Sequence, residues 1–201
     1  DGYIYRVHDG SSQKLMAADD IKLPGTHNLE NYMAAFAATD GYVDDDTCIS
    51  VAKSFSGVEH RLEQVRVLNG VTFINDSIGT SPTRTAAGLH ALKQKPILIA
   101  GGYDKHIPFD ELGDEICLHV KKLYLTGATT EKIYDAVTKS KYFDGSLPIE
   151  KIDNFKDTVL AAANSARDGD IVLLSPACAA FDKFKNFTER GKYFKQIVME
   201  L

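Results

Sequence analysis

The chain of 201 residues has no long hydrophobic run and no surplus of basic residues. No apolar stretch approaches the roughly 20 residues that a membrane-spanning helix requires, and the first residues lack the basic-then-apolar pattern of a secretory signal. The formal net charge is −5, with lysine and arginine dispersed along the sequence, so there is no electrostatic footprint for nucleic acid. We therefore expect a soluble protein in which local cations hold any anionic ligand.

Cysteine is scarce, and metal-binding spacings are absent. The three cysteines are odd in number and far apart, as is typical of buried thiols in a reducing cytosol. The six histidines form no HxxxH pattern, and the cysteines form no CxxC pair. We expect a cytoplasmic protein with no metal site built wholly from this chain.

Two glycine-rich phosphate-binding signatures are also missing. The sequence contains neither a GxGxxG dinucleotide fingerprint nor a GxxxxGK[ST] phosphate loop. These absences disfavour an independent dehydrogenase or ATPase. The hydrophobic content of 44% is nevertheless enough for a substantial core.

The first quarter of the chain predicts a small separate unit. Tyr3–Val7 alternates like a strand, and residues 14–23 could form the returning strand. Because a lone hairpin is marginally stable in water, we expect this one to have been cut from a larger sheet. Helices are expected at 29–39 and 45–54, and Phe55–Gly57 then breaks the pattern, so we place a domain boundary there.

From residue 58 onward, expected strands alternate with expected helices. The strong turn signal Asn69-Gly70 predicts a hairpin. The expected strands are 65–68, 71–75, 97–100, 122–125, 150–152 and 171–174, and the expected helices are 82–92, 109–119, 131–139, 155–167 and 189–199. This alternation predicts an α/β fold, with a Rossmann-like, mainly parallel sheet covered by helices on both faces. Ligands of such sheets bind at the carboxyl ends of the strands.

Two loops at expected strand ends carry candidate binding groups. Asp76 leaves an apolar strand, where a carboxylate is costly unless it accepts hydrogen bonds, and ribose hydroxyls would supply them. Thr80 or Ser81 is expected to cap the following helix, with Pro82 in its first turn, and this capped turn explains part of the loop. In the second loop, two glycines precede Lys105, a cation for an anionic ligand. This glycine–lysine pattern alone does not separate a ligand loop from an ordinary turn.

Two earlier segments add further candidates. Asn28 and Asn31 are three residues apart, so both side chains emerge on one face of a helical turn. Such a pair could cap a helix, or could bind a base or ribose, because each amide both donates and accepts. Arg61 follows the expected boundary, where a guanidinium is suited to bridging phosphates when two domains close.

The most specific motif is the string SPACAAFD at 175–182, followed by a segment rich in lysine and phenylalanine that ends at Gly191. A well-packed strand-to-helix turn would account for its small residues. The whole string, however, resembles the C-terminal signature of the Mur ligase family, in the branch that adds D-glutamate to UDP-N-acetylmuramoyl-L-alanine. The resemblance extends over the whole chain, and the order of the other motifs agrees with it.

The resemblance implies a domain assignment and a set of binding residues. Residues 1–57 would be the C-terminal tail of the central ATP-binding domain, and residues 58–201 the complete C-terminal Rossmann-like domain. The implied nucleotide contacts are Asn28, Asn31, Arg61 and Asp76. The implied D-glutamate contacts are Thr80, Lys105, Ala180, Phe181 and Phe187. The phosphate loop, the magnesium ligands and a carbamylated lysine of the family would all lie upstream of this chain.

The implied reaction is ATP- and Mg²⁺-dependent amide formation for peptidoglycan precursor synthesis. The carboxylate of the UDP-linked substrate becomes an acyl phosphate, which the amine of D-glutamate attacks, so that positioning and charge neutralisation supply most of the catalysis. The expected partners are small molecules, with neither nucleic acid nor membrane, and the chain is expected to be monomeric. Without a phosphate loop, the fragment alone is expected to be inactive.

Two positions depart from the family pattern, and two alternatives stay open. Many members have a lysine in place of Ile78 and a serine in place of Ala180, so one cationic and one hydroxyl contact are missing or supplied elsewhere. The first alternative is another Mur-type or a folylpolyglutamate-type ligase, which the SPACA string disfavours. The second is a non-catalytic Rossmann-like binding module, which the missing phosphate loop favours and the truncated hairpin disfavours.

Overall fold

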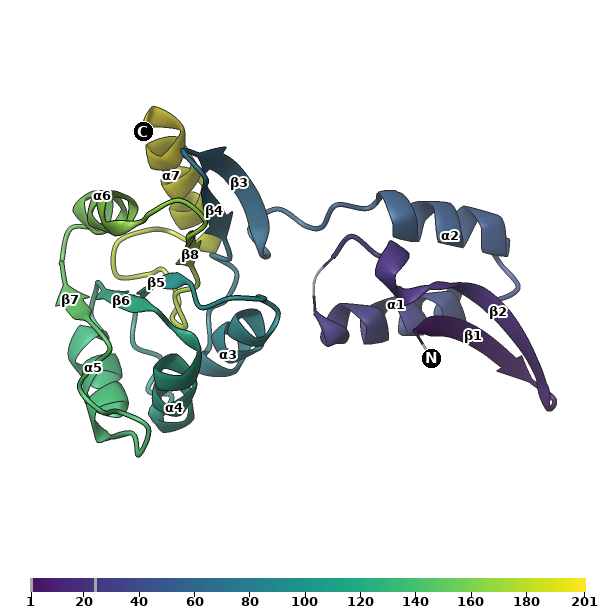
Figure 1. The fold of residues 1–201 in the computed structure, drawn as a ribbon, viewed down its shortest axis with the longest axis horizontal. Helices are drawn as coiled ribbons and strands as arrows, with labels where there is room; N and C mark the ends of the chain where they lie inside the picture. Colours follow the sequence, from purple (N-terminus) through teal and green to yellow (C-terminus); the bar gives the residue numbers. More distant parts are fainter. Residues whose placement is uncertain (1, 24) are drawn as a thin grey trace. The chain divides into compact units, whose positions relative to one another are not determined.

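The computed structural model describes residues 2–23 and 25–201, with the backbone alone for residues 26 and 27. It divides into two compact units, Asp1–Gly57 and Val58–Leu201 (Figure 1). Within the described ranges, no helix has the length and apolar character needed to cross a membrane.

The first unit is a hairpin with two helices. Strand β1 (Tyr3–His8) pairs antiparallel with β2 (Ser11–Ala17), and the helices are α1 (Thr26–Thr39) and α2 (Asp45–Ser54). A small apolar core holds these elements together, and its buried members are Ile4, Met16, Phe36 and Ala52. The returning strand, predicted at 14–23, begins earlier, at Ser11, and ends at Ala17, because a single 3-10 turn, Ala18–Asp20, diverts the chain.

The second unit contains a six-stranded sheet. Its strands are β3 (Glu63–Leu68), β4 (Val71–Asn75), β5 (Ile97–Ala100), β6 (Lys122–Leu125), β7 (Ile149–Lys151) and β8 (Ile171–Leu174). The spatial order is β3-β4-β8-β5-β6-β7, with β3 antiparallel to β4 and every other pair parallel. The last strand, β8, therefore lies between β4 and β5, and the carboxyl ends of these three strands are neighbours.

Helices cover both faces of this sheet (Figure 1). They are α3 (Pro82–His90), α4 (Asp110–His119), α5 (Thr130–Lys139), α6 (Phe155–Ser165) and α7 (Phe187–Glu200). Successive strand side chains alternate between the faces: Leu98 and Leu173 join the core under α3, α4 and α5, whereas Ile99 and Val172 join the core under α6 and α7. The predicted α/β fold class is thus confirmed.

The structure shows how the N-termini of two helices, α7 and α3, are capped. The closing helix begins at Phe187, two residues earlier than expected, because the side chain of Asn186 accepts a hydrogen bond from the amide of Glu189 at 2.9 Å and so caps it. Helix α3 has Ser81 at the N-cap position and Pro82 in its first turn. The expected side-chain cap is wrong in detail, because the Ser81 hydroxyl lies 3.3 Å from the Thr83 hydroxyl instead of bonding a helix amide.

Candidate functional site

The loops that follow β4, β5, β6 and β8 meet at one edge of the sheet. The register places Asn75 beside Leu174, Leu174 beside Ile99, and Ala100 beside Leu125. These four strands therefore end level with one another. The polar residues that follow them are brought together by the topology, as expected of the carboxyl edge of a parallel sheet.

Asp76 is buried at this edge and already has two partners in the chain. One carboxylate oxygen accepts from the Ser175 hydroxyl at 2.7 Å, and the other accepts from the Leu62 amide at 3.2 Å. Burial raises the pKa of Asp76 to about 6, although these hydrogen bonds and the charges of Arg61 and Arg84 oppose the rise. The carboxylate thus has a structural role in holding these two loops, and its ligand role stays a prediction.

The loop after Asp76 needs a glycine. A Cβ at Gly79 would lie 2.6 Å from an Asp76 carboxylate oxygen and 3.0 Å from the Ser175 hydroxyl oxygen. The Gly79 amide donates to the Asp76 carbonyl at 2.8 Å, and the Thr80 amide donates to the Ile78 carbonyl at 2.8 Å. This tight turn holds Thr80, half-buried, close to Asp76.

The glycine pair after β5 permits close contact with the loop after β8. Gly102 has φ 149°, and a Cβ there would lie 2.5 Å from the Ala179 carbonyl oxygen. The next residue, Tyr103, donates its amide to that same carbonyl at 2.9 Å, and its ring packs edge-on against Phe181 with centroids 5.9 Å apart. The exposed side chain of Lys105 and the Ala180-Phe181 turn therefore lie on two loops in direct contact.

The buried side chain of Arg190 links the loop after β4 to the loop after β8. No role for this residue was predicted. Its side chain is 2% exposed. It donates to the hydroxyl and carbonyl of Ser77 at 3.0 and 2.9 Å, to the carbonyl of Cys178 at 3.0 Å and to the carbonyl of Ala179 at 3.2 Å. Burial lowers its pKa to about 10, so the guanidinium stays charged at neutral pH. The one sequence signal for this role is the position of Arg190 in the segment that follows SPACAAFD and ends at Gly191.

A second buried polar residue, His60, precedes Arg61 and was also not predicted. His60 Nδ1 lies 2.9 Å from the side-chain nitrogen of Asn75, which is a donor, so Nδ1 accepts and the imidazole is neutral. Burial lowers the His60 pKa, in agreement with the neutral form. His60 and Leu62 both have left-handed backbone angles, φ 69° and 43°, which fix the backbone on either side of Arg61.

Phe187 lies near His60, at the start of α7. Their rings meet edge to face with centroids 6.0 Å apart, and the Phe187 carbonyl accepts from the Ser77 hydroxyl at 2.8 Å. Phe187 is thus joined to the loop after β4. Phe181, by contrast, is 64% exposed beside the loop after β5.

The asparagine pair belongs to the first unit. Asn31 donates to the Asn28 side-chain oxygen at 3.4 Å, so both side chains do lie on one face of α1. The N-cap residue of α1 is Gly25, so neither asparagine occupies the N-cap position. The predicted nucleotide contacts are therefore divided between the two units.

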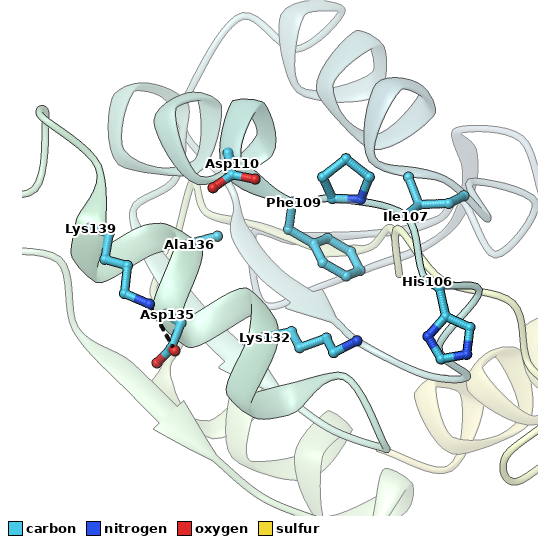
Figure 2. A pocket seen from close by; sticks show the side chains of 9 residues that line it. His106, Ile107, Phe109, Asp110, Lys132, Asp135, Ala136 and Lys139 are labelled. Atoms are coloured by element: carbon cyan, nitrogen blue, oxygen red, sulfur yellow. Dashed lines mark hydrogen bonds and ion pairs between the residues drawn. The ribbon is translucent and has the colours of Figure 1, made fainter.

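A pocket with a volume of about 390 Å³ lies beside the loop that carries Lys105 (Figure 2). Residues 106–110 and α5 line it, and none of the predicted site residues does. Its lysines are paired within the chain: Lys139 lies 3.1 Å from Asp135, and Lys132 pairs with Asp104. The pocket therefore offers little unpaired charge for an anionic ligand.

Most of the second unit matches a known protein family. Residues 60–178, more than half of the chain, match the family model described as "Mur ligase, glutamate ligase domain". The chain belongs to the Mur ligase family. The matched segment contains Arg61, Asp76, Thr80 and Lys105, whereas the predicted residues of α1 and of the C-terminal string lie outside it.

Two relatives within the Mur ligase family show how far the similarity extends. The UDP-N-acetylmuramoylalanine–D-glutamate ligase of Acetivibrio thermocellus is 51% identical over 94% of this chain and 42% of its own length. The ligase of the same name from Ruminiclostridium cellulolyticum is 46% identical over 100% of this chain and 44% of its own length. The chain thus spans less than half the length of the curated relatives that it matches.

Two solved structures share the fold at low identity. A pseudomurein peptide ligase type C from Methanothermus fervidus gives a TM-score of 0.65 at 16% identity, over 99% of this chain and 40% of that one. The Mycobacterium tuberculosis folylpolyglutamate synthase complexed with ADP and AMPPCP gives 0.64 at 14% identity, over 95% of this chain and 47% of that one. Both share the Mur ligase architecture of this chain.

Proposed function

We propose that this chain is part of an ATP-dependent ligase that joins D-glutamate to UDP-N-acetylmuramoyl-L-alanine, in the synthesis of peptidoglycan precursors. Identities of 46% and 51% to relatives with that name support the proposal. The observation that carries it is the contact between the Gly102–Tyr103 loop and the SPACAAFD loop, which joins the loop that carries Lys105 to the loop that carries Ala180 and Phe181. Residues 1–57 would be the tail of the ATP-binding domain, and residues 58–201 the D-glutamate-binding domain.

The proposed D-glutamate site lies between the loops after β4, β5 and β8. Lys105 is exposed, and its mobile ammonium is suited to a carboxylate. Thr80 adds a hydroxyl donor, and the turn at Ala180 and Phe181 adds backbone amides. Phe187, the first residue of α7, provides an apolar wall. Arg190 holds the loop backbones in place and leaves a buried positive charge behind them.

The proposed nucleotide contacts are Arg61 and Asp76 in the second unit and Asn28 and Asn31 in the first. Arg61 is exposed between two residues with left-handed backbones, which suits a phosphate contact. Asp76 accepts one hydrogen bond on each oxygen, and each oxygen has a second lone pair for a ribose hydroxyl. Arg61 and Asp76, within the second unit, suit a phosphate and a ribose of a nucleotide. Because Asp76 is buried and engaged, we propose that the Mg²⁺ ligands lie outside this edge.

The proposed chemistry depends on orientation and charge. ATP supplies the phosphoryl group that activates the carboxylate of the UDP-linked substrate. Lys105 and Thr80 orient D-glutamate so that its amine attacks the acyl carbon of the acyl phosphate, which forms the amide bond and releases inorganic phosphate, and nearby cations neutralise the charge that develops. Lys105 is therefore a positioning residue and not a general base. We also propose a cytoplasmic location and a monomeric state, in agreement with free thiols at Cys48, Cys117 and Cys178.

NMR titration of the isotope-labelled chain tests the proposed D-glutamate site. D-glutamate should shift the amide signals of Thr80, Lys105 and Phe181, and L-glutamate at the same concentration should shift them far less. The Lys105→Ala variant should lose the response, whereas Lys139→Ala, which removes a lysine already paired with Asp135, should keep it. Equal shifts with both enantiomers, or shifts confined to other loops, would contradict the proposed site.

A further inference from the structure

Three metal-ligating side chains converge far from the carboxyl edge of the sheet. His90 is the last residue of α3, Glu115 lies within α4, and His119 is the last residue of α4. Their ligand atoms all lie within 4.8 Å of one another. Helix α3 leads into β5 and α4 leads into β6, so the cluster lies at the amino ends of these strands, opposite the proposed ligase site.

The distances suit a small four-coordinate ion. Zinc–nitrogen bonds of about 2.0–2.1 Å in a tetrahedron place neighbouring ligand atoms about 3.3–3.4 Å apart. His119 Nε2 lies 3.4 Å from a Glu115 carboxylate oxygen, which agrees with that spacing. His90 Nε2 lies 2.5 Å from the same oxygen, so the ion would require this pair to open by about 1 Å. His90 and Glu115 are 55% and 28% exposed, so solvent reaches the cluster.

Charge and ligand chemistry both favour a transition metal. The carbonyl ends of α3 and α4 carry partial negative charge, and Glu115 adds a full negative charge, so the cluster attracts a cation. Two imidazoles with one carboxylate suit Zn²⁺ and its neighbours, whereas Mg²⁺ and Ca²⁺ prefer oxygen ligands alone.

A second cluster, formed by Glu59, His60 and Glu63, is less suited to a metal ion because a lysine already pairs with its carboxylates. Lys195 already neutralises it, since its ammonium lies 3.1 Å from Glu59 and 2.5 Å from Glu63. His60 is buried, and its Nδ1 is engaged by Asn75. Among the side chains that the structure describes, this comparison leaves the cluster on α3 and α4 as the metal-site candidate.

We propose that His90, Glu115 and His119 form a binding site for Zn²⁺ or a related divalent transition metal that fastens α3 to α4. Water would complete the coordination. Because the site is remote from Lys105 and the SPACAAFD loop, the ion would stabilise the second unit without entering the ligase reaction. The histidine spacings along the chain did not reveal it, because His90 and Glu115 are 25 residues apart and only the fold joins them.

Calorimetric titration of the metal-free chain with ZnCl₂ tests this site. We expect one Zn²⁺ per chain and a higher Tm in its presence. His90→Gln, Glu115→Gln and His119→Gln should each weaken binding at least about tenfold, since even outer-shell partners of a metal are worth 10- to 100-fold. The matched control is His106→Gln, which removes an exposed histidine beside Asp104 and should leave the affinity unchanged.

Two further readouts separate loss of the site from loss of the fold. Circular dichroism should show unaltered helix content in Glu115→Gln, which is nearly isosteric. The imidazole NMR signals of His90 and His119, and not those of His106, should shift on addition of Zn²⁺. Absence of binding, unchanged affinity in all three variants, or an equal loss in His106→Gln would overturn the proposal.

Discussion

Asp76 is a buried carboxyl whose pKa is raised by burial to about 6 from an ordinary 3.8. A raised pKa in the folded state means that the native protein binds more protons than the unfolded chain between these two values. The protonated carboxyl therefore makes its whole contribution to the free energy of unfolding below pH 3.8. This contribution is lost as the pH rises through 6. The loss is about 3 kcal/mol, at about 1.4 kcal/mol per pKa unit.

The Asp76→Asn variant tests this linkage, because it carries no titrating proton. We expect the difference in free energy of unfolding, wild type minus variant, to decrease by about 2 kcal/mol between pH 4 and pH 6.5, because part of the total change falls outside this interval. Urea denaturation at a series of pH values measures it, and other titrating groups cancel in the difference. Parallel pH profiles for the two proteins would show that Asp76 titrates normally.

Lys105 is the residue on which the proposed D-glutamate site depends most. In a full-length ligase that contains this chain, Lys105→Ala should raise the KM for D-glutamate by roughly tenfold or more, because a charge-assisted contact contributes about 1.5 to 3 kcal/mol. The KM for ATP should stay nearly constant. Steady-state kinetics with each substrate varied in turn measures both, with Lys139→Ala as the control.

A change in the ATP parameters of Lys105→Ala would point to a different role for Lys105. If Lys105→Ala changed the ATP parameters and left those of D-glutamate unaltered, Lys105 would serve the phosphates in place of the lysine that Ile78 replaces. The assignment of this loop to D-glutamate would then be wrong.

At the scale of elements, Arg190 in α7 ties the loop after β4 to the loop after β8. Arg190→Ala would leave the buried carbonyls of Ser77, Cys178 and Ala179 without this donor. The Ala179 carbonyl keeps the Tyr103 amide as a donor, so two buried carbonyls are left unsatisfied. With a cost of about 1–3 kcal/mol for each, we expect a loss of at least about 2 kcal/mol in the free energy of unfolding. The control Arg66→Ala removes a half-buried donor to carbonyls at the end of α7 and should cost less than half as much. Equal losses in urea denaturation would contradict this role.

The elements differ in how far their sequence reveals them. The β5 and β8 segments are predictable because four apolar residues stand between polar or turn residues in each case. The returning hairpin strand is overestimated, because nothing in residues 14–23 marks the 3-10 turn at Ala18. Likewise, Thr80 and Lys105 can be named as site candidates from their loops, whereas Arg190 and His60 cannot. Their roles depend on partners more than ten residues away, which only the folded chain brings near.

For the whole molecule, we expect that this chain alone has no ligase activity. It lacks the GxxxxGK[ST] loop that would hold the phosphates of ATP. Mixed with ATP, Mg²⁺, UDP-N-acetylmuramoyl-L-alanine and D-glutamate, the purified chain should release no phosphate above the rate without protein. A colorimetric phosphate assay measures this, and clear turnover would contradict the domain assignment.

We propose that this chain supplies the D-glutamate-binding part of a Mur ligase. The most direct measurement uses a chimera in which it replaces the equivalent segment of the Acetivibrio thermocellus relative, which is 51% identical to it. With ATP and UDP-N-acetylmuramoyl-L-alanine present, kcat/KM is determined for D-glutamate, L-glutamate and meso-diaminopimelate. We expect amide formation with D-glutamate strongly preferred over the other two. A soluble, folded chimera that prefers another amino acid, or that forms no amide with D-glutamate, would contradict it.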